Sequence, residues 1–98
     1  MPAAYVLVDN TVHNVETYAT YIEQIAPTVA QYGGEYLIRG GEVLFQDSDW
    51  RPSRLVVMRF PDAAAAQRWI EAPELQQLHQ MRRDNARSQM ILIEGVDG

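Results

Sequence analysis

Segments with strand or helix patterning follow one another along 98 residues in the order strand, helix, strand, strand, helix, strand. Such a β-α-β-β-α-β order is typical of an antiparallel sheet that carries both helices on one face. A chain of this length holds one domain, because an independent core usually needs on the order of 100 residues. We therefore predict a single α+β domain of the ferredoxin-like type over residues 1–98.

The first part of the chain supplies two strands and one helix. Ala3 to Asp9 is rich in β-forming apolar residues, which predicts the first strand. Asn14 is a typical helix N-cap, and the apolar residues after it recur at intervals of three and four, as on the buried side of a helix. The helix should end at Gly33, and Pro27 should kink or restart it. Glu35 to Arg39 predicts the second strand.

Turn residues and periodicity divide the rest of the chain. The pair Gly40–Gly41 suggests a bulge in the second strand, and Pro73 should break a helix that is rich in alanine. The remaining predicted elements are a continuation of the second strand over Glu42–Gln46, a third strand over Arg54–Phe60, helices over Ala63–Glu71 and Glu74–Ala86, and a last strand over Met90–Glu94. We expect Trp69 to pack against the sheet with Ile22, Ile25 and Val57.

The predicted strands are apolar on both faces. In the third strand, Leu55 and Val57 point to one face and Val56 and Met58 to the other. Since the helices can cover one face only, the other would expose more apolar surface than monomers normally show. We expect this face to be buried against a second copy of the chain, which gives a homodimer paired through its sheet faces. The alternative is that curled strand ends and long helices cover it.

Charge and composition exclude several classes of function. The 8 basic residues, all of them arginine, are outnumbered by 13 acidic ones, and a net charge of −5 argues against nucleic acid or an anionic membrane as the main partner. The absence of cysteine excludes disulfides and thiolate sites, and suits a cytoplasmic protein. The 2 histidines lie too far apart in sequence for a typical zinc site, so we predict no metal and no cofactor, with haem left open because one histidine would suffice.

Several short motifs are distributed along the whole chain. They are Tyr32-Gly33-Gly34, Arg39-Gly40-Gly41, Trp50-Arg51-Pro52 followed by Arg54, Phe60-Pro61, Trp69 with Pro73-Glu74, and Glu94-Gly95. With these motifs the chain resembles the domain of unknown function 1330 family, an uncharacterised bacterial family of the dimeric α/β barrel superfamily. Arg59, Leu75 and His13-Asn14 depart from the family's usual residues. The resemblance implies the fold and the dimer, but relatives range from cofactor-free monooxygenases and isomerases to ligand-binding regulators, so it leaves the function open.

Two arginines and a tryptophan form the first candidate site. Arg39, Trp50 and Arg54 lie at the ends of neighbouring predicted strands or in the loop between them. Two guanidinium groups beside an indole would bind a planar carboxylate or enolate through bidentate hydrogen bonds and stacking. The alternative is structural: Arg54 pairs with Asp47 or Asp49, and Trp50 packs on the hairpin.

Two tyrosines are further candidates for the same site, and one histidine is considered separately for proton transfer. Tyr18 and Tyr21 lie about one helical turn apart and could offer phenol groups to a pocket between helix and sheet, or could belong to the core. His79 is the histidine better placed for proton transfer, but a lone histidine lacks an orienting partner, and we expect it to be exposed on its helix.

These residues predict a small cofactor-independent enzyme or enzyme-like binder for a small anionic or carbonyl-bearing organic molecule, of the isomerase, monooxygenase or lactone-handling type. The alternative is a non-catalytic ligand-binding or accessory homodimer, since the sequence shows no nucleophile with a base beside it. A cavity with Arg39 and a tyrosine pointing into it would favour the first hypothesis, and a filled core the second.

Overall fold

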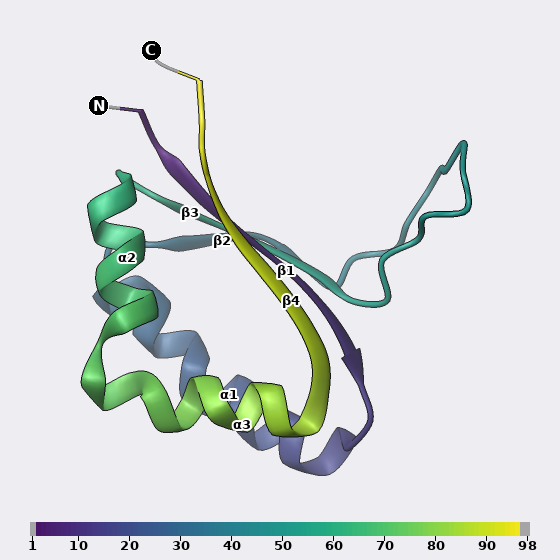
Figure 1. Ribbon diagram of the computed structural model, residues 1–98, viewed down its shortest axis with the longest axis horizontal. Helices are drawn as coiled ribbons and strands as arrows, with labels where there is room; N and C mark the ends of the chain where they lie inside the picture. Colours follow the sequence, from purple (N-terminus) through teal and green to yellow (C-terminus); the bar gives the residue numbers. More distant parts are fainter. Residues whose placement is uncertain (1, 97–98) are drawn as a thin grey trace.

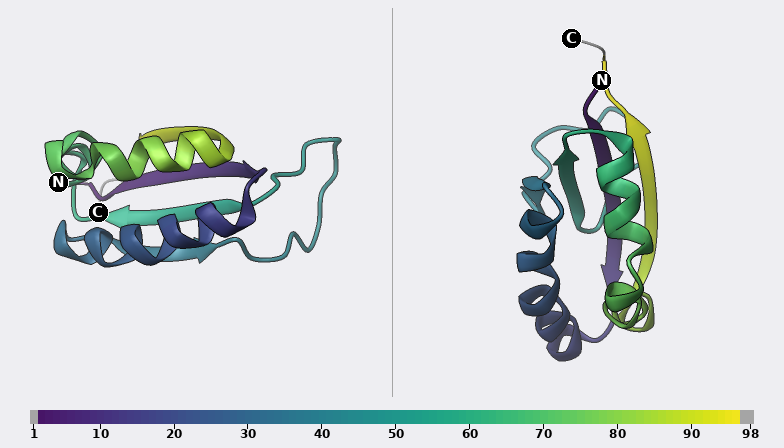
Figure 2. Two further views of the ribbon diagram at one scale, coloured as in Figure 1. Left: turned by 90° about the horizontal axis from the view of Figure 1, so that it is seen from below. Right: turned by 90° about the vertical axis from the view of Figure 1, so that its left-hand side faces the viewer.

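A four-stranded antiparallel sheet with helices packed on one face makes up the computed structural model, which describes residues 2–96 (Figures 1 and 2). The elements are β1 (Ala4–Val12), α1 (Val15–Gln31), β2 (Glu35–Arg39), β3 (Leu55–Phe60), α2 (Ala63–Glu71), the short 3-10 helix η1 (Pro73–Leu75), α3 (Gln76–Asn85) and β4 (Ala86–Glu94). The strand order across the sheet is β2-β3-β1-β4. The predicted β-α-β-β-α-β fold is therefore confirmed.

The long helix α1 begins and ends as its sequence predicts. The Asn14 side chain accepts a hydrogen bond from the Thr17 amide at 3.2 Å, which satisfies one of the free donors of the first turn. Pro27 lies inside the helix without ending it. Gly33 follows with a φ of +87°, the left-handed conformation that glycine adopts without a steric penalty.

Strands β1 and β4 are longer than predicted. They pair over nine positions, from Ala4 opposite Glu94 to Val12 opposite Ala86. The sequence predicts that β1 ends at Asp9, because polar residues follow it, and that β4 begins at Met90, because polar residues precede it. The correction has a simple cause: backbone amides and carbonyls form the ladder whatever side chains they carry. The extension places Asn10 on the same face as Val6 and Val8, towards the helices.

The predicted continuation of β2 over Glu42–Gln46 is wrong. Residues 41–52, called the arm below, form a long exposed loop that projects away from the sheet (Figures 1 and 2). The register shift lies inside β2, between Tyr36 and Ile38, not at the glycine pair. Gly40 instead has a φ of +74°, which turns the chain out of the sheet where the bulge was expected.

The core lies between the sheet and the helices. Trp69 is buried there, with its ring centre 5.8 Å from that of Phe60 and 4.8 Å from that of His79. Ile25 belongs to the same cluster and Ile22 packs against it, as predicted. Val57 was misplaced, because β3 directs Val56 and Met58 to the helices and Val57 to the opposite side.

The second side of the sheet carries no helix in the described chain. We call it the open face, and define it by Tyr5, Leu7, Leu55, Val57, Ile91 and Ile93. The side chains of Ile91 and Ile93 are each about half exposed. The open face thus has the apolar centre that the strand pattern predicted, flanked by the polar residues Asp9, Arg59, Arg87 and Gln89. Within residues 2–96 no helix combines the length and apolar content that crossing a bilayer requires.

Candidate functional site

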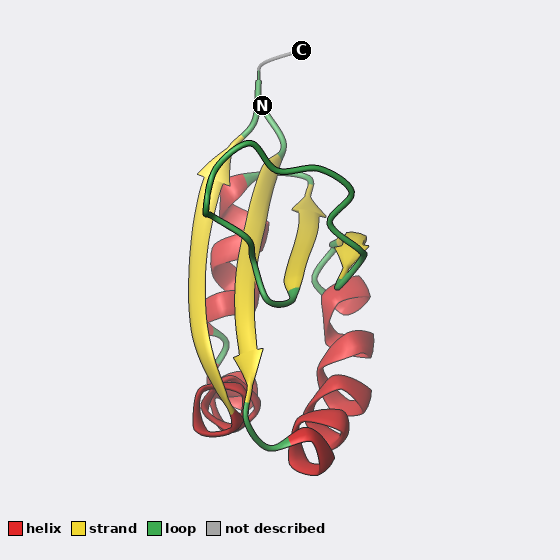
Figure 3. Cartoon of the chain, turned by 90° about the vertical axis from the view of Figure 1, so that its right-hand side faces the viewer, coloured by secondary structure: helices red, strands yellow, loops and turns green. Residues whose placement is uncertain are grey.

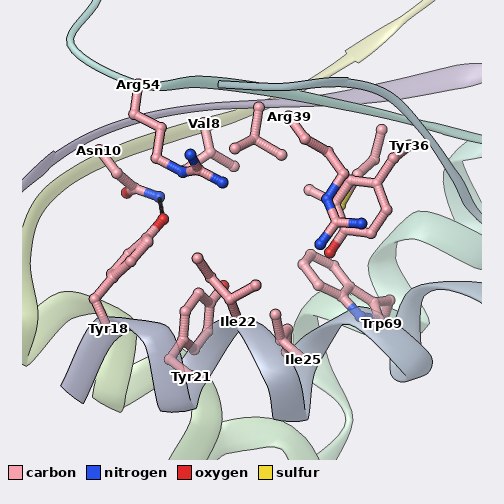
Figure 4. Close-up of a pocket in the computed structure, with 12 residues that line it drawn as sticks. Val8, Asn10, Tyr18, Tyr21, Ile22, Ile25, Tyr36, Arg39, Arg54 and Trp69 are labelled. Atoms are coloured by element: carbon pink, nitrogen blue, oxygen red, sulfur yellow. Dashed lines mark hydrogen bonds between the residues drawn. The ribbon is translucent and has the colours of Figure 1, made fainter. Parts of the chain in front are cut away.

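A cleft lies between helix α1 and the helix-facing side of the sheet (Figure 4). Its lining residues are Val8, Asn10, Tyr18, Tyr21, Ile22, Ile25, Tyr36, Arg39, Arg54, Val56, Met58 and Trp69. The space measures about 30 Å³, enough for one or two water molecules. A larger ligand therefore requires side chains at the mouth to move. The cleft brings together four of the five predicted site residues, namely both arginines and both α1 tyrosines.

The two arginines enter the cleft from the sheet side, opposite the tyrosines of α1 (Figure 4). The Arg39 guanidinium carbon lies 4.3 Å from the centre of the Tyr36 ring, and that of Arg54 lies 5.9 Å from the centre of the Tyr18 ring. Gly40 makes room for this arrangement, since a Cβ atom there would lie 3.0 Å from the Arg54 guanidinium carbon and closer still to its Nη1. Within the described residues, Arg54 forms no ion pair with Asp47 or Asp49, the structural alternative considered above.

Asn10 is a cleft residue that the sequence reasoning missed. It is only 2% exposed, and its Nδ2 donates a hydrogen bond of 2.7 Å to the Tyr18 hydroxyl. Because that hydroxyl accepts from Asn10, its own hydrogen remains free to be donated. Continuing the alternation of Val6 and Val8 by one step would have placed Asn10 on this face.

Two buried polar atoms in the cleft wall lack a partner. They are the Oδ1 atom of Asn10 and the Nε atom of Arg54, neither of which forms a hydrogen bond within residues 2–96. A buried donor or acceptor without a partner costs free energy, so such atoms are rare in folded proteins and often have a functional cause. A ligand or water in the cleft could satisfy them.

The buried phenol groups of the cleft stay protonated near neutral pH. Burial raises the pKa of Tyr21 above its ordinary value of 10.0, although the positive charge of Arg82 opposes that rise. Burial likewise raises the pKa of Tyr36. Neutral phenols donate hydrogen bonds, so these side chains present the cleft with donors and no negative charge.

His79 is buried, which corrects the prediction that it is exposed. Only 2% of its surface is accessible, and it lies behind Trp69 and outside the lining of the cleft. Its Nδ1 accepts a hydrogen bond of 3.0 Å from Arg82, so the ring hydrogen is on Nε2, which donates to the Trp69 carbonyl at 3.2 Å. Helix α3 packs against α1 and β4, and this packing buries a polar residue that its helix pattern alone would expose.

His79 should make folding sensitive to acid. Burial lowers its pKa below the ordinary 6.5, and the charges of Arg82 and Arg83 lower it further, so the folded state resists protonation. Its contribution to the free energy of unfolding is therefore full above pH 6.5 and is lost as the pH falls through the folded-state pKa. Urea unfolding at several pH values should show a smaller acid loss for His79→Gln than for the wild type. The same change at exposed His13 should leave the loss intact, and equal losses in all three proteins would contradict the assignment.

Trp50 lies apart from the other predicted site residues. It is on the arm, where its side chain is 69% exposed and its amide donates a 3.4 Å hydrogen bond to the Ser48 hydroxyl. Sequence proximity to Arg54 suggested a common site, but the arm carries the indole away from the cleft. In the part of the chain that the structure describes, no cluster of three or more histidine, aspartate or glutamate side chains is suited to a metal ion.

Known structures share this fold at low sequence identity. A protein of unknown function from Rhodopseudomonas palustris matches 99% of this chain and 85% of its own, with a TM-score of 0.74 and 17% identity. SnoaB, a cofactor-independent oxygenase from Streptomyces nogalater, matches 100% of this chain and 97% of its own, with a TM-score of 0.66 and 16% identity. An antibiotic biosynthesis monooxygenase matches 96% and 99%, with a TM-score of 0.56 and 14% identity. At these identities the likenesses show a shared ferredoxin-like fold.

The sequence itself matches one described family. No curated protein matches it. The profile of the domain of unknown function called DUF1330 covers residues 3–96, which is nearly the whole chain. The residues matched include the cleft arginines, the arm and the buried Trp69. The chain therefore belongs to the DUF1330 family.

Proposed function

We propose that the cleft binds a small anionic or carbonyl-bearing organic molecule, and that the protein is an enzyme-like binder that needs no cofactor. The observation that carries this proposal is the pair Arg39 and Arg54. Both guanidinium groups line the cleft, and neither forms an ion pair within residues 2–96, although the chain has a net charge of −5. A cleft with unpaired positive charge in an acidic protein favours an anion.

The donors around the cleft suit an oxygen that carries or develops negative charge. Guanidinium groups bind carboxylates and enolates through parallel hydrogen bonds. The phenol groups of Tyr18 and Tyr21 face them from helix α1 (Figure 4). Such fixed donors stabilise an enolate or oxyanion that forms during a reaction. This chemistry is shared by the isomerase, monooxygenase and lactone-handling types, and the description of SnoaB as a cofactor-independent oxygenase supports the oxygenase type for this fold.

A non-catalytic ligand-binding homodimer is the second candidate, and one observation favours it. The cleft lining contains no aspartate, glutamate or histidine, so it offers no ordinary general base. A reaction that starts by removing a proton would need a ligand acidic enough to arrive ionised, or a base from outside this lining. For both candidate functions, we expect a cytoplasmic protein whose open face is covered by a second copy of the chain.

A thermal-shift screen tests the proposal. Small carboxylates and enolisable ketones should be compared with amides and alcohols of the same size. A specific ligand at 100 times its dissociation constant stabilises the folded state by about 2.7 kcal/mol. We expect stabilisation by at least one anionic or carbonyl compound and not by its neutral, carbonyl-free counterpart. Stabilisation by neutral apolar compounds alone would contradict the proposal.

Gly40 offers a test of the cleft that leaves every lining side chain unchanged. In Gly40→Ala, the added methyl group should displace the Arg54 guanidinium and weaken binding of the best screen ligand by about tenfold, the loss of one charge-assisted hydrogen bond. Gly41→Ala controls for an added methyl group, because a Cβ there would contact nothing within 4 Å, and urea unfolding of Gly40→Ala measures separately the backbone strain expected at its φ of +74°. Calorimetric titration of both variants measures the difference. Equal affinities would show that Arg54 does not hold the ligand.

A further inference from the structure

The arm carries large apolar side chains that residues 2–96 leave exposed. Leu44 is 89% exposed, Phe45 82% and Trp50 69%. Scattered single apolar residues are common on protein surfaces, but Phe45 and Trp50 line one groove together, and Leu44 is the neighbour of Phe45 in sequence. Loops of this length are usually functional when they carry such residues. We therefore expect a partner molecule to cover the arm.

The arm lies on the same side of the sheet as the open face. Viewed with the helices behind the sheet, the arm passes in front of the strands (Figure 3). A groove of about 330 Å³ lies at its base, lined by arm residues and by Leu55 of the open face. Because Leu55 belongs to both surfaces, the arm and the open face form one continuous apolar surface. A partner that covers the open face would meet the arm as well.

The open face is of the size that a dimer interface needs. Four strands of this length, spaced about 4.8 Å apart with about 3.3 Å per residue, have a projected area on the order of 500 Å², and the accessible area of their side chains is larger. Stable interfaces bury about 800 Å² of accessible surface on each partner. Sheet contact therefore comes near a standard interface, and the arm is the adjacent surface that can enlarge it.

Charge is compatible with a second copy as the partner. The chain has a net charge of −5, so two copies repel unless their contact surface is nearly neutral. Around the open face, Arg59 pairs with Glu35 at 3.6 Å, and the Asp9 carboxylate accepts hydrogen bonds from the amides of Ser53 and Arg54. Arg87 also lies on this face, opposite Thr11, so the acidic Asp9 and Glu35 and the basic Arg59 and Arg87 leave the open face close to neutral, whereas the arm carries three acidic residues and Arg51. A nearly neutral apolar face suits a two-fold pair, in which each surface meets its own copy.

We propose that, when two copies pair through their open faces, the arm of each closes over the other and buries Leu44, Phe45 and Trp50 against the partner. The inference rests on the homodimer proposed above and adds a second contact to it. It gives Trp50 a place in the dimer instead of in the ligand site.

Tryptophan fluorescence tests the inference directly. The chain has 2 tryptophans, and Trp69 is buried in the core, so subtracting the signal of Trp50→Phe isolates Trp50. Light scattering at micromolar concentration should give twice the chain mass, and acrylamide should quench Trp50 several-fold less than free N-acetyltryptophanamide. A dimer whose Trp50 is quenched like the free compound would overturn the arm contact and leave the dimer standing. A monomer mass would overturn both.

Arm variants provide an independent measurement. Leu44→Ser combined with Phe45→Ser should raise the dissociation constant of the dimer by at least about tenfold, while circular dichroism stays unchanged because both residues lie outside the core. Glu42→Ser, an exposed polar residue of the same arm, should leave that constant within about twofold. Equal dissociation constants for the double variant and the control would overturn the proposal.

Discussion

Trp69→Ala is expected to lower the free energy of unfolding by about 3–5 kcal/mol, the range for large aromatic residues removed from cores. The indole is buried between helix α2 and the sheet, packs on Phe60 and His79, and donates a 3.0 Å hydrogen bond from Nε1 to the Thr28 hydroxyl. Its removal leaves a cavity and takes the donor from Thr28. The His79 ring would also lose the edge contact that holds it.

Urea unfolding at a fixed protein concentration measures this loss. Trp69→Phe is a useful second variant, because it keeps an aromatic ring and removes the Nε1 donor. Trp69→Phe should lower the free energy of unfolding by less than Trp69→Ala does. The loss in the phenylalanine variant includes the hydrogen bond to Thr28, and the further loss in the alanine variant measures the packing of the aromatic ring. A loss below about 1 kcal/mol for Trp69→Ala, the size typical of surface positions, would show that the helix packing described above is wrong.

Arg39→Lys and Arg54→Lys are each expected to weaken binding of an anionic ligand by about tenfold or more. Lysine keeps the positive charge but cannot reproduce the planar fork of a guanidinium, and a lost charge-assisted hydrogen bond is worth about 1.5–3 kcal/mol. Folding stability should change by less than about 1 kcal/mol, because neither arginine forms an ion pair in the described chain.

Calorimetric titration with the best ligand from the screen measures the change in affinity. Arg68→Lys is the matched control, since Arg68 is exposed on α2 and lies outside the cleft lining. Its affinity should equal that of the wild type. Unchanged affinity in both cleft variants would remove the arginines from the site and favour the accessory homodimer.

Periodicity predicted the fold well because each element has one face to bury. The three- and four-residue spacing of α1 predicted its buried side, and the two-sided strands predicted an open face, although Val57 was assigned to the helix-facing side and lies on the open one. Strand ends were harder to predict. Side chains such as Asn10 do not show where a backbone ladder stops, so β1 was predicted too short and Asn10 was missed.

The arm and His79 depend on contacts that sequence alone does not contain. Alternating residues after Gly41 resemble a strand, yet no strand within the described residues pairs with them, and the segment leaves the sheet. Because this segment leaves the sheet, Trp50 is also carried away from Arg54, although the two residues are close in sequence. His79 is buried because Arg82 supplies the partner for its Nδ1, an i and i+3 pair whose burial is set by the packing of α3 on its neighbours.

The arginine Nε–H resonances provide the most direct test of the cleft as a ligand site. The chain has 8 arginines and no lysine, so the spectrum is simple. On titration with the best ligand, the Arg54 signal should shift most, because its Nε is buried without a partner. The Arg82 signal should move little, since that Nε already donates to Ser88 at 3.0 Å outside the cleft lining. A ligand that shifts the signals of exposed arginines and leaves Arg54 unchanged would contradict the proposed site.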